Sequence, residues 1–145
     1  MKRITLFIML MICTVSAAMA QKNLKIDQAF DGRYRDNPAV QEVFITGSQL
    51  RGYGLSLYHS LTIQGMPEEA KVLEKMVVND GKNAVDKEIV YRDGGLYYGF
   101  YQFDAKFDGY RYIFYLDQNR TGGNKTILIY MEGVASPEVI KKMLK

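Results

Sequence analysis

The stretch LYYGFYQFDAKFDGYRYIFYLDQNRTGGNKTILIYME, residues 96–132, decides the fold of this chain of 145 residues. It contains three runs rich in aromatic and β-branched residues, at 96–104, 110–117 and 125–132, with glycine-containing segments between them. A further run of this kind, at 87–92, ends just before a glycine pair. Because short turn segments between such runs favour hairpins, the sequence predicts an antiparallel meander of four strands.

Both faces of this meander are apolar, whereas a sheet with one face in water is polar on that face. Alternation along the strands gives one set of residues that we expect helices to cover, consisting of Leu96, Tyr98, Phe100, Tyr112, Phe114, Leu116, Ile127, Ile129 and Met131. The opposite set is rich in tyrosine. We predict a binding site on that face, formed by Tyr97, Tyr101, Arg111, Tyr115 and Tyr130.

Tyrosine joins a large rigid ring to one hydroxyl, so a tyrosine cluster on an open sheet suits a protein partner, a peptide or a stacked sugar ring. We expect Gly99 to leave a shallow depression among the rings. Two alternatives remain at this point. Tyrosine has high strand propensity, so the N-terminal helix or the first hairpin could cover this face, or two copies of the chain could pair through it as a homodimer.

The residues before the meander predict a hairpin and helices. Strand-like runs at 40–46 and 55–63 favour a hairpin, although a helical stripe over 50–63 is also possible. Apolar spacing predicts a short helix at 26–34, and prolines followed by acidic residues open helices at 67–78 and near 139–144. We therefore expect an α+β fold, a mostly antiparallel sheet with helices on one side.

An internal similarity indicates a possible duplication. Residues 72–77 resemble residues 139–144, and each run follows a strand, a glycine and a proline-opened helix start. A duplicated ββα unit would explain this similarity, and so would chance resemblance between two ordinary amphipathic helices.

The first twenty residues have the pattern of a cleavable signal peptide. A positive start is followed by an apolar stretch and by Ala18-Met19-Ala20, which predicts cleavage after Ala20 and export to the periplasm or the extracellular space. The apolar stretch is too short to span a membrane. The only cysteine, Cys13, would leave with residues 1–20, and residues 21–145 would form a single α+β domain without a disulfide.

Charge and chemistry exclude several classes of function. Removal of Lys2 and Arg3 would lower the formal net charge from +3 to +1, and basic and acidic residues alternate along most segments, so we expect no nucleic-acid partner. With His59 as the only histidine, a site with two imidazole ligands cannot form in one chain. The sequence predicts no cofactor, no metal site and no catalytic residue.

Three features together resemble a known group of proteins. They are the Ala-Met-Ala-Gln junction at 18–21, the segments 43–47 and 54–58 with Leu50, and the closing Ser-Pro-Glu helix start. They resemble small exported proteins of unknown function from gut Bacteroidetes. The resemblance implies a periplasmic or surface location, and it carries over no activity and no functional residues.

These observations favour an exported, non-enzymatic binding domain that uses its tyrosine-rich sheet face. The first alternative is a small inhibitor or chaperone-like module built from two related halves. The second is an exported hydrolase that uses His59 or surface carboxylates.

Overall fold

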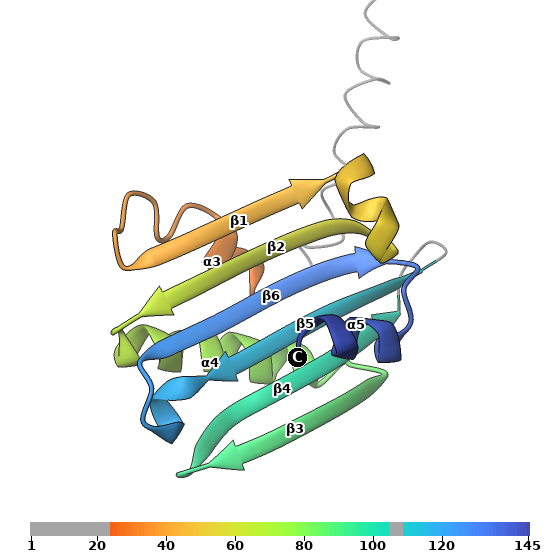
Figure 1. The fold of residues 1–145 in the computed structure, drawn as a ribbon. Helices are drawn as coiled ribbons and strands as arrows, with labels where there is room; N and C mark the ends of the chain where they lie inside the picture. Colours follow the sequence, from red (N-terminus) through yellow and green to blue (C-terminus); the bar gives the residue numbers. More distant parts are fainter. Residues whose placement is uncertain (1–23, 105–108) are drawn as a thin grey trace, which may run out of the picture.

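The computed structural model describes residues 24–104 and 109–145, so the predicted signal peptide and its cleavage site lie outside the described residues. The described chain forms a six-stranded antiparallel sheet in the order β1-β2-β6-β5-β4-β3 (Figure 1). Its strands are β1 (Val40–Thr46), β2 (Leu55–Gln64), β3 (Asp86–Arg92), β4 (Gly95–Asp104), β5 (Tyr110–Asp117) and β6 (Lys125–Gly133). This confirms the α+β class, the first hairpin and the four-strand meander. The helical alternative for 50–63 is wrong, because β2 occupies most of that segment.

Helices lie on both faces of the sheet. The long helix α4 (Pro67–Gly81) and the short α3 (Asp27–Phe30) lie on one side, which we call the back face (Figure 1). Helix α5 (Pro137–Met143) lies on the other side, the front face, in front of β4 and β5. The expectation of helices on one side therefore holds for α3 and α4 and fails for α5. Two 3₁₀ turns, η1 (Ser48–Tyr53) and η2 (Gln118–Thr121), complete the described elements.

The starts of α4 and α5 follow the predicted chemistry. Both helices have proline in the first turn, where the missing N–H has no helical partner to lose. Glu68 and Glu69 lie at the positive end of α4, and the Ser136 side chain accepts a hydrogen bond from the Val139 N–H of α5.

The end of α4 and the segment before β1 differ from the expectation. Helix α4 continues to Gly81, and the buried Asp80 carboxylate accepts the backbone N–H groups of Lys25, at 2.7 Å, and Ile26, at 2.9 Å. Burial raises the pKa of Asp80, and these two hydrogen bonds act in the opposite direction. The predicted helix 26–34 is only the four-residue α3, because Gly32 has a positive φ of 76° and turns the chain.

The positions of α4 and α5 do not support a duplicated ββα unit. Each helix follows a strand, β2 or β6, and these strands are antiparallel neighbours in the sheet. A twofold axis between them, perpendicular to the sheet, would place both helices on the same face. They lie on opposite faces, so the two segments are not equivalent, and the module of two related halves loses its structural basis.

Two apolar clusters fill the space on the two faces. The back core joins the sheet to α3, α4 and the residues before α3, and it includes Leu24, Ile26, Phe30, Leu61, Leu73, Val77, Leu96, Tyr101, Phe103, Ile113, Tyr115, Leu128 and Tyr130. The front core joins the sheet to η1 and α5, and it includes Leu50, Leu55, Phe100, Tyr112, Phe114, Ile129, Met131, Ala135 and Ile140.

A bulge in β4 changes the face of one predicted residue. Val90 of β3 is opposite Tyr98, whereas the next residue, Tyr91, is opposite Leu96, so Tyr97 is an extra residue in β4. Beyond this bulge the alternation reverses. Leu96 therefore belongs to the back core and not to the set with Tyr98 and Phe100.

Candidate interaction surface

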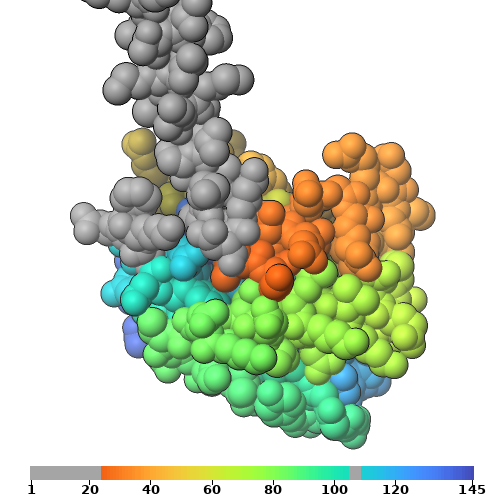
Figure 2. All heavy atoms as spheres, turned by 180° about the vertical axis from the view of Figure 1, so that it is seen from behind, coloured from red at the N-terminus to blue at the C-terminus, as the bar shows by residue number. Residues whose placement is uncertain are grey.

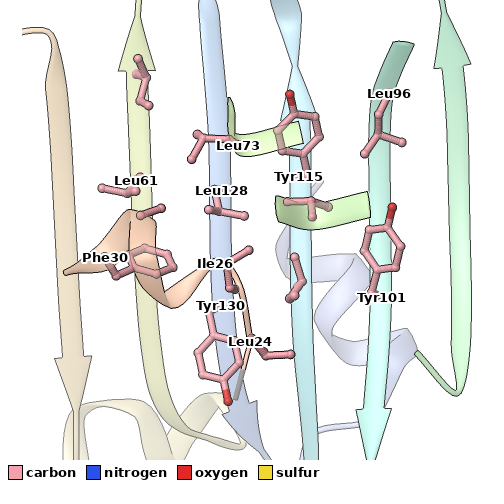
Figure 3. Close-up of a cluster of buried hydrophobic side chains, with 14 of the residues drawn as sticks. Leu24, Ile26, Phe30, Leu61, Leu73, Leu96, Tyr101, Tyr115, Leu128 and Tyr130 are labelled. Atoms are coloured by element: carbon pink, nitrogen blue, oxygen red, sulfur yellow. The ribbon is translucent and has the colours of Figure 1, made fainter. Parts of the chain in front are cut away.

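Three of the five predicted binding residues are buried in the back core. Tyr101 is 3% exposed, and Tyr115 and Tyr130 are 0% exposed. Figure 3 shows their rings on the same side of the sheet as Leu73 of α4. Seen from behind, α4 and the chain before β1 lie over this side (Figure 2). The interpretation of these tyrosines as an open binding surface is therefore wrong, and the structural alternative, a face covered by helix, holds for them.

Burial also governs the chemistry of these hydroxyl groups. Desolvation raises the pKa of Tyr101 to about 12, and it raises the pKa values of Tyr115 and Tyr130 further. The Tyr115 hydroxyl donates to the Ala70 carbonyl oxygen of α4, at 3.2 Å, and the Tyr130 hydroxyl donates to Glu132. All three hydroxyls stay protonated, and those of Tyr115 and Tyr130 serve as internal hydrogen-bond donors.

The predicted depression at Gly99 is filled by a ring. A Cβ atom at Gly99 would lie 2.6 Å from Cε2 of Tyr101, and a Cβ at Gly81, the last residue of α4, would overlap the same ring. The Tyr101 ring is thus held between two glycines, one in the sheet and one in the helix. Both glycines allow a close approach that any larger residue would prevent.

The remaining two predicted binding residues, Tyr97 and Arg111, lie outside the buried back core. Tyr97 is half-buried, and the Arg92 guanidinium carbon lies 4.9 Å from its ring centroid. Arg111 is also half-buried, and its Nε donates to the Asp104 carbonyl oxygen at 3.0 Å. The structure does not bring the five predicted residues into one exposed patch.

The front face carries an accessible apolar row that includes Tyr98, Leu116 and Ile127. We expected helices to cover these three residues, and that expectation is wrong, because α4 packs on the opposite face. Register pairs Val90 with Tyr98, Tyr98 with Leu116, Leu116 with Ile127, and Ile127 with Thr62, so these residues cross the sheet side by side. Val90 is 41% exposed, and the other four are half-buried. We call the set of Val90, Tyr98, Leu116, Ile127 and Thr62 the open row.

Helix α5 stops short of the open row. Its buried Ile140 belongs to the front core with Phe100, Tyr112 and Met131, which lie in the next rows of the sheet. In Figure 1 the helix covers only one end of the front face. The open row therefore lies in a part of the front face that no described helix covers.

Charged groups border the open row but do not enter it. Glu88, on the same face of β3, forms an ion pair with Lys141 of α5 at 2.7 Å, and this hydrogen bond raises the pKa of Lys141. The exposed Lys125 precedes Ile127 on the same face of β6. An uncharged centre with a polar rim is the usual composition of a protein interface.

His59, the residue on which the hydrolase alternative depends, lies in a packed setting. Its Nε2 is 2.8 Å from a Glu42 carboxylate oxygen, and its ring stacks on Phe30 with a centroid distance of 4.0 Å. Phe44 contacts the ring edge-on at 4.8 Å. Packing and the hydrogen bond with Glu42 explain this arrangement without a catalytic role.

A hollow of about 210 Å³ near η2 is lined by Pro67, Lys71, Asp93, Asp117, Asn119 and Arg120. The Arg120 guanidinium, which lines the hollow, is held by residues of the fold. It forms ion pairs with Asp117, at 3.3 Å, and Glu74, at 3.4 Å, and donates a hydrogen bond to the Asp93 carbonyl oxygen. Glu74 in turn accepts the Leu96 N–H at 2.6 Å. These contacts connect the β3–β4 turn to α4.

Among residues 24–104 and 109–145, no group of three or more His, Cys, Asp or Glu residues is arranged to hold a metal ion.

The fold and this surface define an α+β protein with one helix-covered sheet face and one partly open, apolar face. The chain belongs to a family of unknown function, DUF6108, which matches residues 13–144. This confirms the predicted membership in a family without an assigned function. The comparisons with curated proteins and with solved structures gave no match. No helix among the described residues is long and apolar enough to cross a bilayer.

Proposed function

We propose that this chain is an exported, non-enzymatic domain that binds another protein through the open row. The observation that carries the proposal is the cross-strand row of four apolar side chains without a covering helix. An accessible apolar strip bordered by charges favours association, because its burial against a partner removes apolar surface from water.

The composition of the row favours a protein over a sugar. Sugar sites combine aromatic platforms with several polar groups that hydrogen-bond the hydroxyls. The open row has one aromatic ring, that of Tyr98, and its only polar side-chain groups are the hydroxyls of Tyr98 and Thr62 beside three aliphatic residues. A partner with an aliphatic surface patch matches this composition better.

Export rests on the N-terminal sequence pattern. The expected mature protein begins at Gln21, three residues before the buried Leu24. N-terminal sequencing of the protein from the cells that produce it checks this, and a product that still begins at Met1 would contradict cleavage.

Site-specific crosslinking tests the binding surface. A photoreactive benzophenone amino acid replaces Tyr98 in the open row, and Tyr91, which is 57% exposed on β3, provides the matched control position. We expect a crosslinked partner from position 98 that position 91 does not give. Mass spectrometry then identifies this partner for purification.

Calorimetric titration with the purified partner completes the test. We expect Ile127→Asp to weaken binding at least tenfold, because it places a charge in the centre of the apolar row. Lys75→Asp, on the exposed side of α4, should bind like the wild-type protein. A partner that is crosslinked equally from both positions, or whose affinity is unchanged by Ile127→Asp, would contradict the proposal.

A further inference from the structure

The two edge strands of the sheet differ in their protection. Strands β1 and β3 form the edges (Figure 1). Strand β3 has the sequence DKEIVYR with four charged residues, and β1 has the sequence VQEVFIT with only Glu42 charged. Charges on an edge strand prevent pairing with another chain, so β3 is protected and β1 is not.

The accessible surface of β1 fits this contrast. Phe44 is 58% exposed, and Gln41, Glu42 and Thr46 are also exposed. Within the described residues, β1 pairs with β2 alone, so its outer side presents a row of backbone donors and acceptors. The strand contains three β-branched aliphatic residues, one threonine and no proline, a composition suited to strand pairing.

The sequence of β1 is compatible with pairing to itself. In an antiparallel pair with the twofold axis at Val43, Val43 faces Val43 of the second copy, Gln41 faces Ile45, and Glu42 faces Phe44. The only charged residue of the strand, Glu42, therefore does not face Glu42 of the second copy. Two like charges directly opposite each other would destabilise the pair. The formal net charge of +3 for 145 residues also opposes association only weakly.

From these observations we infer that β1 pairs in antiparallel fashion with β1 of a second copy of this chain. The two six-stranded sheets then join into one continuous sheet with a twofold axis at Val43. Val43 and Ile45 are half-buried on the front face, where Val43 meets Val43 of the second copy across the axis and Ile45 meets Gln41. The backbone groups at the edge of β1 become paired.

A charge-swap experiment tests the axis directly. Val43→Lys places two like charges opposite each other in the dimer, and so does Val43→Glu. By light scattering we expect the wild-type protein to have twice the mass of one chain, and each variant alone to have the mass of one chain. An equimolar mixture of the two variants should recover the doubled mass, because lysine then faces glutamate. This recovery separates an interface effect from a folding defect.

Tyr91→Lys serves as the matched control, because Tyr91 is an exposed residue of the other edge strand and lies outside the open row. We expect this variant to keep the doubled mass. A wild-type protein that is a monomer at all concentrations would overturn the inference, as would a Val43→Lys variant that remains a dimer. A monomer that pairs β1 with an added peptide would also overturn it, since the partner would then be a different chain. None of these results depends on the open row.

Discussion

The back and front faces of the sheet are both apolar, yet only the back face is closed by a long helix. The strand order explains the difference. Helix α4 connects β2 to β3, which are four strand spacings apart, a distance of about 19 Å at the usual spacing of about 4.8 Å. A helix of 15 residues is about 22 Å long, so α4 crosses the sheet and covers it. Helix α5 has only seven residues and follows the central strand β6, so it covers one end of the front face.

This comparison teaches that connectivity, and not the apolar character of a face, determines which face is closed. Removing one tyrosine ring from each face tests it. We expect Tyr115→Ala to lower the free energy of unfolding by about 3–5 kcal/mol, because the ring is fully buried under α4 and its loss leaves a cavity. Tyr98→Ala in the open row should lower the free energy of unfolding by only about 1 kcal/mol, because the Tyr98 ring is already partly exposed to water.

Urea denaturation of the two variants and the wild-type protein measures both values. Equal losses of stability would break the comparison, because they would mean that the front face is closed as tightly as the back face. A small loss for Tyr115→Ala would contradict the burial of the back core.

A second prediction concerns the contact between α4 and the sheet. At an exposed position within a helix, Gly→Ala raises the free energy of unfolding by up to about 1 kcal/mol. At Gly81 the added methyl group would overlap the buried Tyr101 ring, so we expect Gly81→Ala to lower the free energy of unfolding by about 1–2 kcal/mol. The sign of the effect is thus reversed.

Gly52→Ala is the matched control, since nothing lies within 4 Å of the position of its Cβ atom. This variant should be neutral or slightly more stable than the wild-type protein in the same urea experiment. A stabilising effect of Gly81→Ala would mean that α4 does not lie close against Tyr101.

Local patterns predicted the strands well because turn residues and strand propensity act over a few neighbouring residues. Four meander strands, the hairpin and the start of α4 at Pro67 follow from such signals. The end of α4 could not be predicted from such signals, because Asp80 and Gly81 resemble a helix stop in the sequence. Their partners, the backbone of Lys25 and the ring of Tyr101, are distant in the chain.

The candidate surface was less predictable, for a related reason. Alternation assigns residues to two sets but cannot say which set a helix will cover when both sets are apolar. The bulge at Tyr97 then moved Leu96 to the other face, and the pairing of β2 with β6 brought Thr62 beside Ile127. Only the long-range arrangement of the strands reveals the open row.

The smallest predicted effect concerns the attachment of the chain before β1 to the back face. Glu69 of α4 accepts hydrogen bonds from the Tyr34 hydroxyl, at 2.7 Å, and from Arg33 Nη2, at 3.1 Å. The hydrogen bond from Tyr34, followed by that from Arg33, lowers the pKa of Glu69, although partial burial acts in the opposite direction.

A carboxylate with a lowered pKa in the folded state stabilises the protein above its ordinary pKa, and this contribution is lost as the pH falls through the lowered value. We expect Glu69→Gln to cost roughly 0.5 kcal/mol at neutral pH, because the cluster is partly open to solvent and screened. The difference from the wild-type protein should vanish once the pH falls below the lowered pKa of Glu69, as measured by urea denaturation at a series of pH values. Glu68→Gln, whose ion pair with Lys71 is exposed, should keep the pH dependence of the wild-type protein. If the Glu69→Gln difference persists at low pH, the carboxylate charge is not what attaches this segment to α4.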